Sequence, residues 1–316
     1  MEKRDLLLQI AHMYYGLGMT QEKIAKHLFF SRSRISHLLT EAEESGIVTF
    51  ELRQQVSQNH FLHDFLCSQF QLQNAFVEDG SFFTENEHYE SICKTAAEYL
   101  CSQLNEKTVL NISRGRTAYG IVHNMKAESP LPTMCVVQTE GMLLMDDPYL
   151  DQMDFVRRVA EIFSCQYEHL MLPYLFDSAE LKNVMISQPF NQAKLARQKD
   201  INLICSSISS LQQWRRHIRD EEYDWLVAHG AVGSIEGNFY DIQGNFLNSP
   251  LQERCIIPPV SILQNAEQLI CVCIGNYKEN ALLGILRTGL VTTLVTNAQL
   301  VQHIRQILLN SPEKPV

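Results

Sequence analysis

The sequence has no apolar run long enough to cross a bilayer, no apolar signal-type segment near its N-terminus and no cysteine pair spaced C-x-x-C. We therefore expect neither a membrane partner nor a zinc site, and no other metal or cofactor. Nine cysteines without regular spacing predict free thiols in a reducing cytoplasm. Cys271 and Cys273 alternate in an apolar run, which predicts small buried side chains on one face of a strand.

Positive charge is also scarce. The chain of 316 residues carries 26 Lys and Arg against 36 Asp and Glu, a net charge of −10. Residues 1–53 contain seven of each sign, so the acidic excess lies entirely in residues 54–316. Any contact of the first segment with nucleic acid would rest on a few local cations and would be salt-sensitive. The length exceeds that of a usual single core, which predicts two domains, 1–53 and 54–316.

Three segments near the N-terminus carry apolar side chains at helical spacing: 6–14, 24–28 and 35–39. Thr20 and Ser31 stand where capping hydroxyls would begin the second and third helices. Because only a few residues separate these two helices, the spacing predicts a helix-turn-helix.

A strand is expected after the third helix. Gly46 is placed to end that helix, and residues 47–52 have the composition of a strand, with Arg53 at its end. Three helices followed by a strand predict a winged helix-turn-helix. The alternative is an ordinary three-helix unit with a few surface arginines.

The beginning of the third helix carries side chains that donate and accept hydrogen bonds. In a recognition helix such a face meets base edges and phosphates of double-stranded operator DNA. We therefore expect a DNA interface formed by Thr20, Gln21, Ser31, Arg32, Ser33, Arg34, Ser36, His37 and Arg53. Since one neutral reading unit binds weakly, a homodimer or homotetramer on paired half-sites is expected.

The second domain begins with a polar linker at 54–59 and a bridging helix at 61–70. Short apolar runs then alternate with amphipathic stretches, which predicts an α/β domain with a mostly parallel, Rossmann-like sheet covered on both faces. Strands are expected at 74–77, 108–112, 134–138, 201–205, 225–228, 269–274 and 290–295. Helices are expected at 87–104, 117–125, 153–163, 178–187, 278–286 and 298–309.

Ligands of such sheets gather outside the carboxyl ends of the strands. Three loops there, 112–117, 138–141 and 274–278, combine a glycine with polar side chains. Glycine lets the backbone approach an anion that N–H groups, hydroxyls and cations can bind. The 241–244 turn supplies a further carboxylate, although a plain hairpin with an Asp-x-x-Gly turn is the alternative. The expected effector-binding residues are Gly115, Arg116, Thr117, Thr139, Gly141, Asp241 and Lys278.

The N-terminal pattern T-Q-x-x-I-A-x-x-L, S-R-x-x-I-S-x-L-L and G-I-V spans residues 20–48. Further blocks stand at 115–117, 230–233, 239–244 and 286–296. Through these motifs nearly the whole chain resembles the SorC/DeoR-type sugar-binding transcriptional regulators. The resemblance implies an effector domain similar in fold to the ribose-phosphate and glucosamine-phosphate isomerases. It also implies a small phosphorylated sugar as effector and assembly into dimers or tetramers.

Several residues depart from the pattern of this family, and two of them bear on the predicted sites. Phe29 stands where a glycine usually forms the turn between the reading helices, so this turn must avoid positive φ or bear its cost. Glu140 stands in a loop that is usually rich in glycine. Its carboxylate would repel a phosphate unless it turns outward.

The expected function is a ligand-responsive DNA-binding regulator without catalytic residues. The alternative is a sugar-phosphate isomerase-like enzyme fused to a DNA-binding head, with Asp241, Glu140 or His229 as the base. No motif places these three side chains together as a working set. A scaffold that binds no ligand is the third option.

Overall fold

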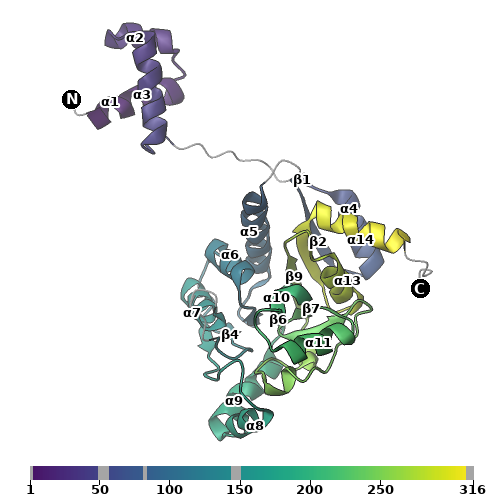
Figure 1. Ribbon diagram of the computed structural model, residues 1–316. Coiled ribbons are helices and arrows are strands. Elements are labelled where there is room, and N and C mark those ends of the chain that lie inside the picture. Colours follow the sequence, from purple (N-terminus) through teal and green to yellow (C-terminus); the bar gives the residue numbers. More distant parts are fainter. Residues whose placement is uncertain (1–2, 49–56, 81–83, 144–150, 311–316) are drawn as a thin grey trace. The chain divides into compact units, whose positions relative to one another are not determined.

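The chain divides into two compact units, Met1–Gln55 and Val56–Val316. The computed structural model describes residues 3–48, 57–80, 84–143 and 151–310 (Figure 1). Each unit has hydrophobic clusters of its own and is described separately below.

The first unit is helical. Its elements are α1 (Lys3–Ala11), the π-helical turn η1 (His12–Gly16), α2 (Gln21–Leu28) and α3 (Arg32–Glu44). The Thr20 hydroxyl accepts a hydrogen bond from the backbone N–H of Lys23, and the Ser31 hydroxyl accepts one from Arg34, as the predicted caps require. The apolar stripes of the three helices meet in one core, whose most buried members are Ile10, Ile24 and Ile35.

The turn between α2 and α3 is left-handed although it contains no glycine. Phe29 has φ of 55° and a side chain that is 94% exposed, so no packing compensates its backbone strain. Gly46, with φ of 72°, ends α3 as predicted.

The predicted strand at 47–52 is wrong in its first two residues. The backbone N–H groups of Ile47 and Val48 both donate to the carbonyl of Ala42, so these residues close the end of α3. The remainder of the predicted wing and Arg53 lie outside the described residues.

The second unit is built on a ten-stranded sheet (Figure 1). Its strands are β1 (Ser57–Gln58), β2 (Asn74–Asp79), β3 (Val109–Ile112), β4 (Cys135–Val137), β5 (Gln166–Glu168), β6 (Leu203–Ser210), β7 (Ala231–Ile235), β8 (Asn238–Asp241), β9 (Gln268–Cys273) and β10 (Thr293–Asn297). The main order is β1-β2-β10-β9-β6-β3-β4-β5, and β7 and β8 continue from β6. Neighbours are parallel except β1 on β2 and the β6-β7-β8 meander, which confirms the mostly parallel prediction.

Helices cover both faces of this sheet, as predicted. One face packs against α4 (His60–Phe70), α12 (Val260–Asn265), α13 (Glu279–Arg287) and α14 (Ala298–Asn310). The other packs against α5 (Glu85–Gln103), α6 (Arg116–Asn124) and α7 (Gln152–Phe163). Cys271 and Cys273 are buried in the first of these cores, which confirms their assignment to one strand face.

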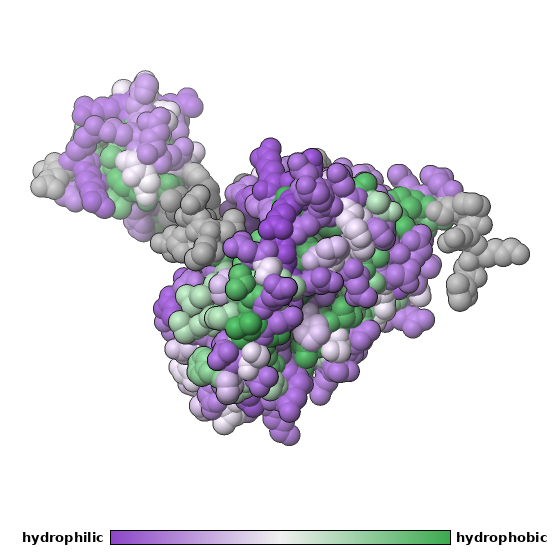
Figure 2. All heavy atoms as spheres, turned by 60° about the horizontal axis from the view of Figure 1, so that its bottom comes forward, coloured by the Kyte–Doolittle hydropathy of each residue, from purple (hydrophilic) through white to green (hydrophobic). Residues whose placement is uncertain are grey.

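Shorter helices lie in the connections. They are α8 (Ala179–Ile186), α9 (Pro189–Arg197), α10 (Leu211–Trp214) and α11 (Asp220–Ala228), with the 3-10 turns η3 (Gln198–Asp200) and η4 (Gln252–Arg254). Helix α8 buries none of its residues, and its Leu181 and Val184 and the α9 residue Phe190 are more than half exposed. Figure 2 brings the end that carries α8 and α9 forward and shows apolar patches among polar atoms on this face. None of the helices in the described ranges combines the length and apolar character needed to span a membrane.

Three sequence expectations for this unit are corrected. Residues 225–228 belong to α11, because the apolar run is one helical turn in which only Leu226 is buried while Trp225 stacks on His229. Ser57 and Gln58, expected in a linker, pair with β2. The last strand begins at Thr293 rather than at residue 290.

Candidate functional site

The first unit presents a polar surface at the beginning of α3. Arg32, Ser33, Arg34, Ser36 and His37 are all exposed. On the opposite side of the same helix Ile35 and Leu39 are buried. The helical periodicity of α3 therefore places apolar side chains in the core and polar side chains on the surface.

Neighbouring contacts orient two of these cations. The Arg34 guanidinium lies 4.2 Å from the centroid of the Phe30 ring, and Arg32 lies 3.9 Å from the carboxylate of Glu22. The capping hydroxyls of Thr20 and Ser31 accept bonds from the backbone, which leaves their own hydrogens able to donate to a phosphate.

The second unit has a pocket where its strand order reverses direction. From β3 the chain proceeds outward to β4 and β5, and from β6 it proceeds the other way to β9 and β10. Ligands of open α/β sheets bind at such a switch point. The pocket there, which we call the switch-point pocket, has a volume of about 430 Å³. It is lined by Arg114, Gly115, Arg116, Leu143, Tyr174, Leu175, Ser209, Gln213, Trp214, His217, Ile218 and Leu251.

Arg114 is the more buried of the two arginines in this lining, whereas Arg116 is exposed; we call the part of the lining around Arg114 the inner end and the part around Arg116 the outer end. The Nε of Arg114 lies 2.7 Å from Glu140 Oε2, and its guanidinium lies 4.0 Å from the centroid of the Tyr174 ring. The side chain is only 17% exposed, yet its buried Nη1 has no hydrogen-bond partner among the described residues. Because a buried N–H without an acceptor is costly, this atom is suited to donate a hydrogen bond to an oxygen of a ligand.

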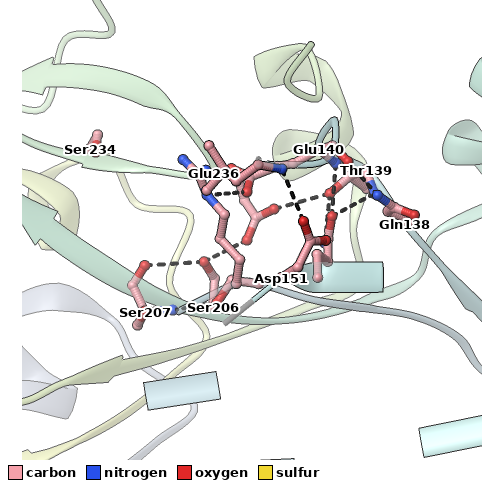
Figure 3. Close-up of polar contacts among 12 residues, drawn as sticks. Gln138, Thr139, Glu140, Asp151, Ser206, Ser207, Ser234 and Glu236 are labelled. Atoms are coloured by element: carbon pink, nitrogen blue, oxygen red, sulfur yellow. Dashed lines mark hydrogen bonds and ion pairs between the residues drawn. The ribbon is translucent and has the colours of Figure 1, made fainter. Parts of the chain in front are cut away.

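Two buried carboxylates, Glu140 and Glu236, belong to the polar cluster of Figure 3, and Arg114 forms an ion pair with the first of them. Glu236 receives hydrogen bonds from Ser206 Oγ at 2.7 Å and Asn111 Nδ2 at 3.1 Å, and the Thr139 hydroxyl lies 3.1 Å from it. Burial raises the pKa of Glu140 to about 7; Arg114 opposes this rise and Glu236 adds to it. Burial also raises the pKa of Glu236, against the hydrogen bonds that its neighbours donate. Glu140 therefore turns inward, contrary to what a phosphate in its loop would require.

The 139–141 loop has no free backbone donors. The N–H groups of Thr139 and Glu140 both donate to Gln152 Oε1, at 3.2 and 2.9 Å. The N–H of Gly141 donates to the carbonyl of Ile256, and a Cβ at this glycine would lie 2.4 Å from the Pro173 oxygen. Thr139 and Gly141 thus use their backbone N–H groups in hydrogen bonds within the protein, and neither residue lines the pocket.

The 113–117 loop is different. Gly115 has φ of 97° and caps α6 without any side-chain hydrogen bond. The first N–H groups of this helix therefore have no intrahelical acceptor and no cap within the described ranges. Gly115 and Arg116 line the pocket, and the Arg116 guanidinium lies 4.6 Å above the ring of Tyr89.

The remaining predicted effector residues lie elsewhere. Thr117 is half-buried in the first turn of α6. Asp241 closes a turn by accepting bonds from Gln243 and Asn245, which is the plain-hairpin alternative. Lys278 is 7% exposed, and its Nζ donates to the carbonyl of Ile208 at 2.8 Å. The structure thus brings Gly115 and Arg116 to the switch-point pocket and leaves Thr117, Thr139, Gly141, Asp241 and Lys278 out of its lining.

Sequence reasoning missed Arg114, Tyr174, Trp214 and Glu236. Arg114 belongs to the 112–117 loop, which was selected from the sequence. The sequence does not show that its side chain is largely buried while that of Arg116, two residues later, is exposed. Glu236 occupies the turn of the β7–β8 hairpin with φ of 48°, followed by Gly237 with φ of 72°. This is the type I′ pattern, in which Asn or Gly is usual, so a glutamate there was the available signal.

The candidate bases of an isomerase do not converge. His229 is exposed, and its Nδ1 lies 2.8 Å from the carbonyl of Trp225, the ring on which it stacks. Asp241 is held in its turn and Glu140 is paired with Arg114. Within the described ranges no cluster of three potential ligands could hold a metal ion.

Comparisons with known proteins agree with this architecture. A family described as "Putative sugar-binding domain" matches residues 54–306. The chain is 26% identical to the deoxyribonucleoside regulator of Bacillus subtilis (strain 168), covering 98% of each protein. It is 27% identical to the sorbitol operon regulator of Klebsiella pneumoniae, covering 95% of this chain and 98% of that one.

Solved structures show the same fold. The full-length sorbitol operon regulator SorC from Klebsiella pneumoniae matches with a TM-score of 0.73 at 24% identity, covering 96% of this chain and 99% of that one. A transcriptional regulator from Streptococcus pneumoniae TIGR4 matches with a TM-score of 0.74 at 18% identity, covering 79% and 98%. The predicted α/β class with a mostly parallel sheet is therefore confirmed, whereas the wing of the helix-turn-helix stays a prediction. The curated relatives are named as regulators rather than enzymes.

Proposed function

Because the chain belongs to the SorC/DeoR-type family of sugar-binding transcriptional regulators, we propose that it binds operator DNA under the control of a small carbohydrate. The observation that carries the proposal is the exposed polar face of α3, which begins directly after a tight turn and a serine cap. In a helix-turn-helix this face enters the major groove.

The DNA contacts divide into two groups. We assign base reading to Arg32, Ser33, Ser36 and His37, whose side chains can pair with base edges. Backbone contacts are assigned to the residues at the helix starts and in the segment after α3, namely Thr20, Gln21, Ser31, Arg34 and Arg53. The regulator acts in the cytoplasm on this proposal, where its DNA and effector meet.

A gel-shift assay with duplexes selected from a randomised library tests the assignment. Arg32→Ala should weaken retention of the selected duplex at least tenfold, since a bidentate base contact contributes about 1–3 kcal/mol. Arg216→Ala removes an exposed arginine from the second unit and serves as the control for lost charge. Equal retention by both variants would reject α3 as the reading helix.

The effector is proposed to be a phosphorylated sugar bound in the switch-point pocket. The uncapped N-terminus of α6 and the neighbouring Arg116 support an anion at this end of the pocket. Thermal shift and operator release with ribose 5-phosphate, glucosamine 6-phosphate and their unphosphorylated sugars test this. Failure of every sugar to bind would reject carbohydrate control.

We further propose a homodimer or homotetramer. The neutral first unit can neutralise only a few phosphates, so two copies on one operator would raise affinity, and the exposed apolar side chains of α8 and α9 are suited to self-association. Light scattering of the purified chain measures the state directly, and a monomer at micromolar concentration would contradict the proposal.

A further inference from the structure

The switch-point pocket has two ends with different electrostatics. Its outer end contains Gly115, Arg116 and the first turn of α6, without a carboxylate in the lining. At Gly115 nothing lies within 4 Å of where a Cβ would project, so the backbone here is open to a ligand. An anion at this end would meet helix N–H groups and one cation.

At the inner end Arg114 cannot act as a free cation. Its guanidinium forms an ion pair with Glu140, which is 2% exposed, and Glu236, which is 4% exposed, is a second carboxylate in the same buried cluster. The 139–141 loop has no N–H to offer, because Gln152 and Ile256 accept all three. A second phosphate here would lose its water and gain no net positive charge.

What remains at the inner end is one donor and two aromatic rings, of which Tyr174 already has the Arg114 guanidinium over its face. Arg114 Nη1 is buried without a partner among the described residues. The Trp214 ring is held by a 2.9 Å hydrogen bond from its Nε1 to Ser234, and Tyr174 lies against Arg114. Aromatic faces suit the C–H face of a sugar ring, and one arginine N–H suits a neutral hydroxyl or carbonyl oxygen.

Building on the proposed function, we propose that the pocket accepts sugars with a single phosphate, held at α6, and that Glu140 excludes sugars that carry a second anionic group. The uncharged end of the sugar lies against Trp214, and one of its oxygens accepts a hydrogen bond from Arg114 Nη1. Glu140 acts through Arg114 and is a specificity-determining residue rather than a contact of the phosphate. A volume of about 430 Å³ is adequate for a five- or six-carbon sugar monophosphate.

Calorimetric titration of the full-length protein tests this with matched pairs: ribose 5-phosphate against ribose 1,5-bisphosphate, and fructose 6-phosphate against fructose 1,6-bisphosphate. For the pair whose monophosphate binds, we expect the bisphosphate to bind at least 30-fold more weakly. Glu140→Gln keeps the size of the side chain beside Arg114 and removes its charge, so it should narrow the ratio of the two affinities at least tenfold. Glu267→Gln, at an exposed site, should leave the ratio unchanged.

A second variant covers the case in which Glu140→Gln fails to fold. Arg116→Ala, at an exposed position, should weaken the monophosphate about tenfold and leave the unphosphorylated sugar unaffected. Equal affinity for mono- and bisphosphate in the wild type would overturn the exclusion by Glu140 while sparing carbohydrate control. Equal affinity for the monophosphate and its free sugar would overturn the phosphate end. No binding of any sugar would overturn the proposed function itself.

Discussion

The loops that follow β3 and β4 look alike in sequence and differ in what they do. Both follow buried strands, and both place a glycine beside polar side chains. After β3, Gly115 leaves the first turn of α6 uncapped and open toward the pocket. After β4, every N–H of residues 139–141 is taken by Gln152 or Ile256. A glycine-containing loop at a strand end is therefore a binding loop only when the protein has not already used its donors.

Among the proposed substitutions, removal of Gln152 should destabilise the loop after β4 most strongly. Gln152→Leu would leave two buried N–H groups without acceptors and remove the donor to the Ile112 carbonyl at 2.7 Å. We expect a loss of about 3–5 kcal/mol in the free energy of unfolding, measured in urea. Gln192→Leu, at an exposed site, should change it by less than about 0.5 kcal/mol. Similar values for both variants would mean that the loop after β4 does not depend on these bonds.

The pH dependence of stability should report the buried Glu140. Its pKa is raised from 4.5 to about 7 in the folded chain, so the unfolded state ionises first as pH rises. The stabilisation from this group is full below pH 4.5 and declines up to about pH 7, by at most about 3 kcal/mol. Urea unfolding of wild type and Glu140→Gln across this window should show the extra decline only in the wild type. Parallel curves would indicate that Glu140 is ionised at all these pH values.

The two glycines can be compared directly. Gly141→Ala places a Cβ 2.4 Å from a backbone oxygen and should lower the free energy of unfolding by about 2 kcal/mol. Gly115→Ala meets no atom within 4 Å and bears only the strain of φ at 97°, about 1 kcal/mol. Thermal denaturation of the two variants measures which substitution lowers the stability more. A larger loss at Gly115 would show that this loop is packed rather than open.

The smallest expected effect extends the comparison to the turn of the first unit. Like Gly115, Phe29 has positive φ, but it has a side chain that packs on little. Phe29→Gly should stabilise the α2–α3 region by about 1 kcal/mol because the left-handed strain is relieved. Hydrogen exchange of the α2 and α3 amides in the full-length chain should then slow about fivefold. Faster exchange would show that the greater flexibility of the unfolded chain with glycine outweighs the relief of the backbone strain at residue 29.

The local signals in the sequence identified most of the architecture. The capping hydroxyls of Thr20 and Ser31, and the β-α alternation after residue 70, depend on neighbours in the chain and were confirmed by the structure. The error at residues 225–228 arose because a short apolar run fits a strand and a helical turn equally well.

The candidate site was less predictable. Arg116 was found because its loop carries the anion-binding pattern, whereas Lys278 has the same pattern and is committed to the Ile208 carbonyl. The residues near Lys278 in the sequence do not indicate that its partner is the Ile208 carbonyl, which is 70 residues away.

By itself the sequence determined a helical hairpin with a polar, exposed face and a mostly parallel sheet, because these depend on periodicity, caps and strand spacing within a few residues. Only the tertiary structure decided which way Glu140 turns. Its direction depends on Arg114 from the loop after β3 and on Glu236 from a hairpin far along the chain, and the sheet order brings the three together. Side-chain direction in a buried site is set by partners distant in sequence, and only the folded chain supplies them.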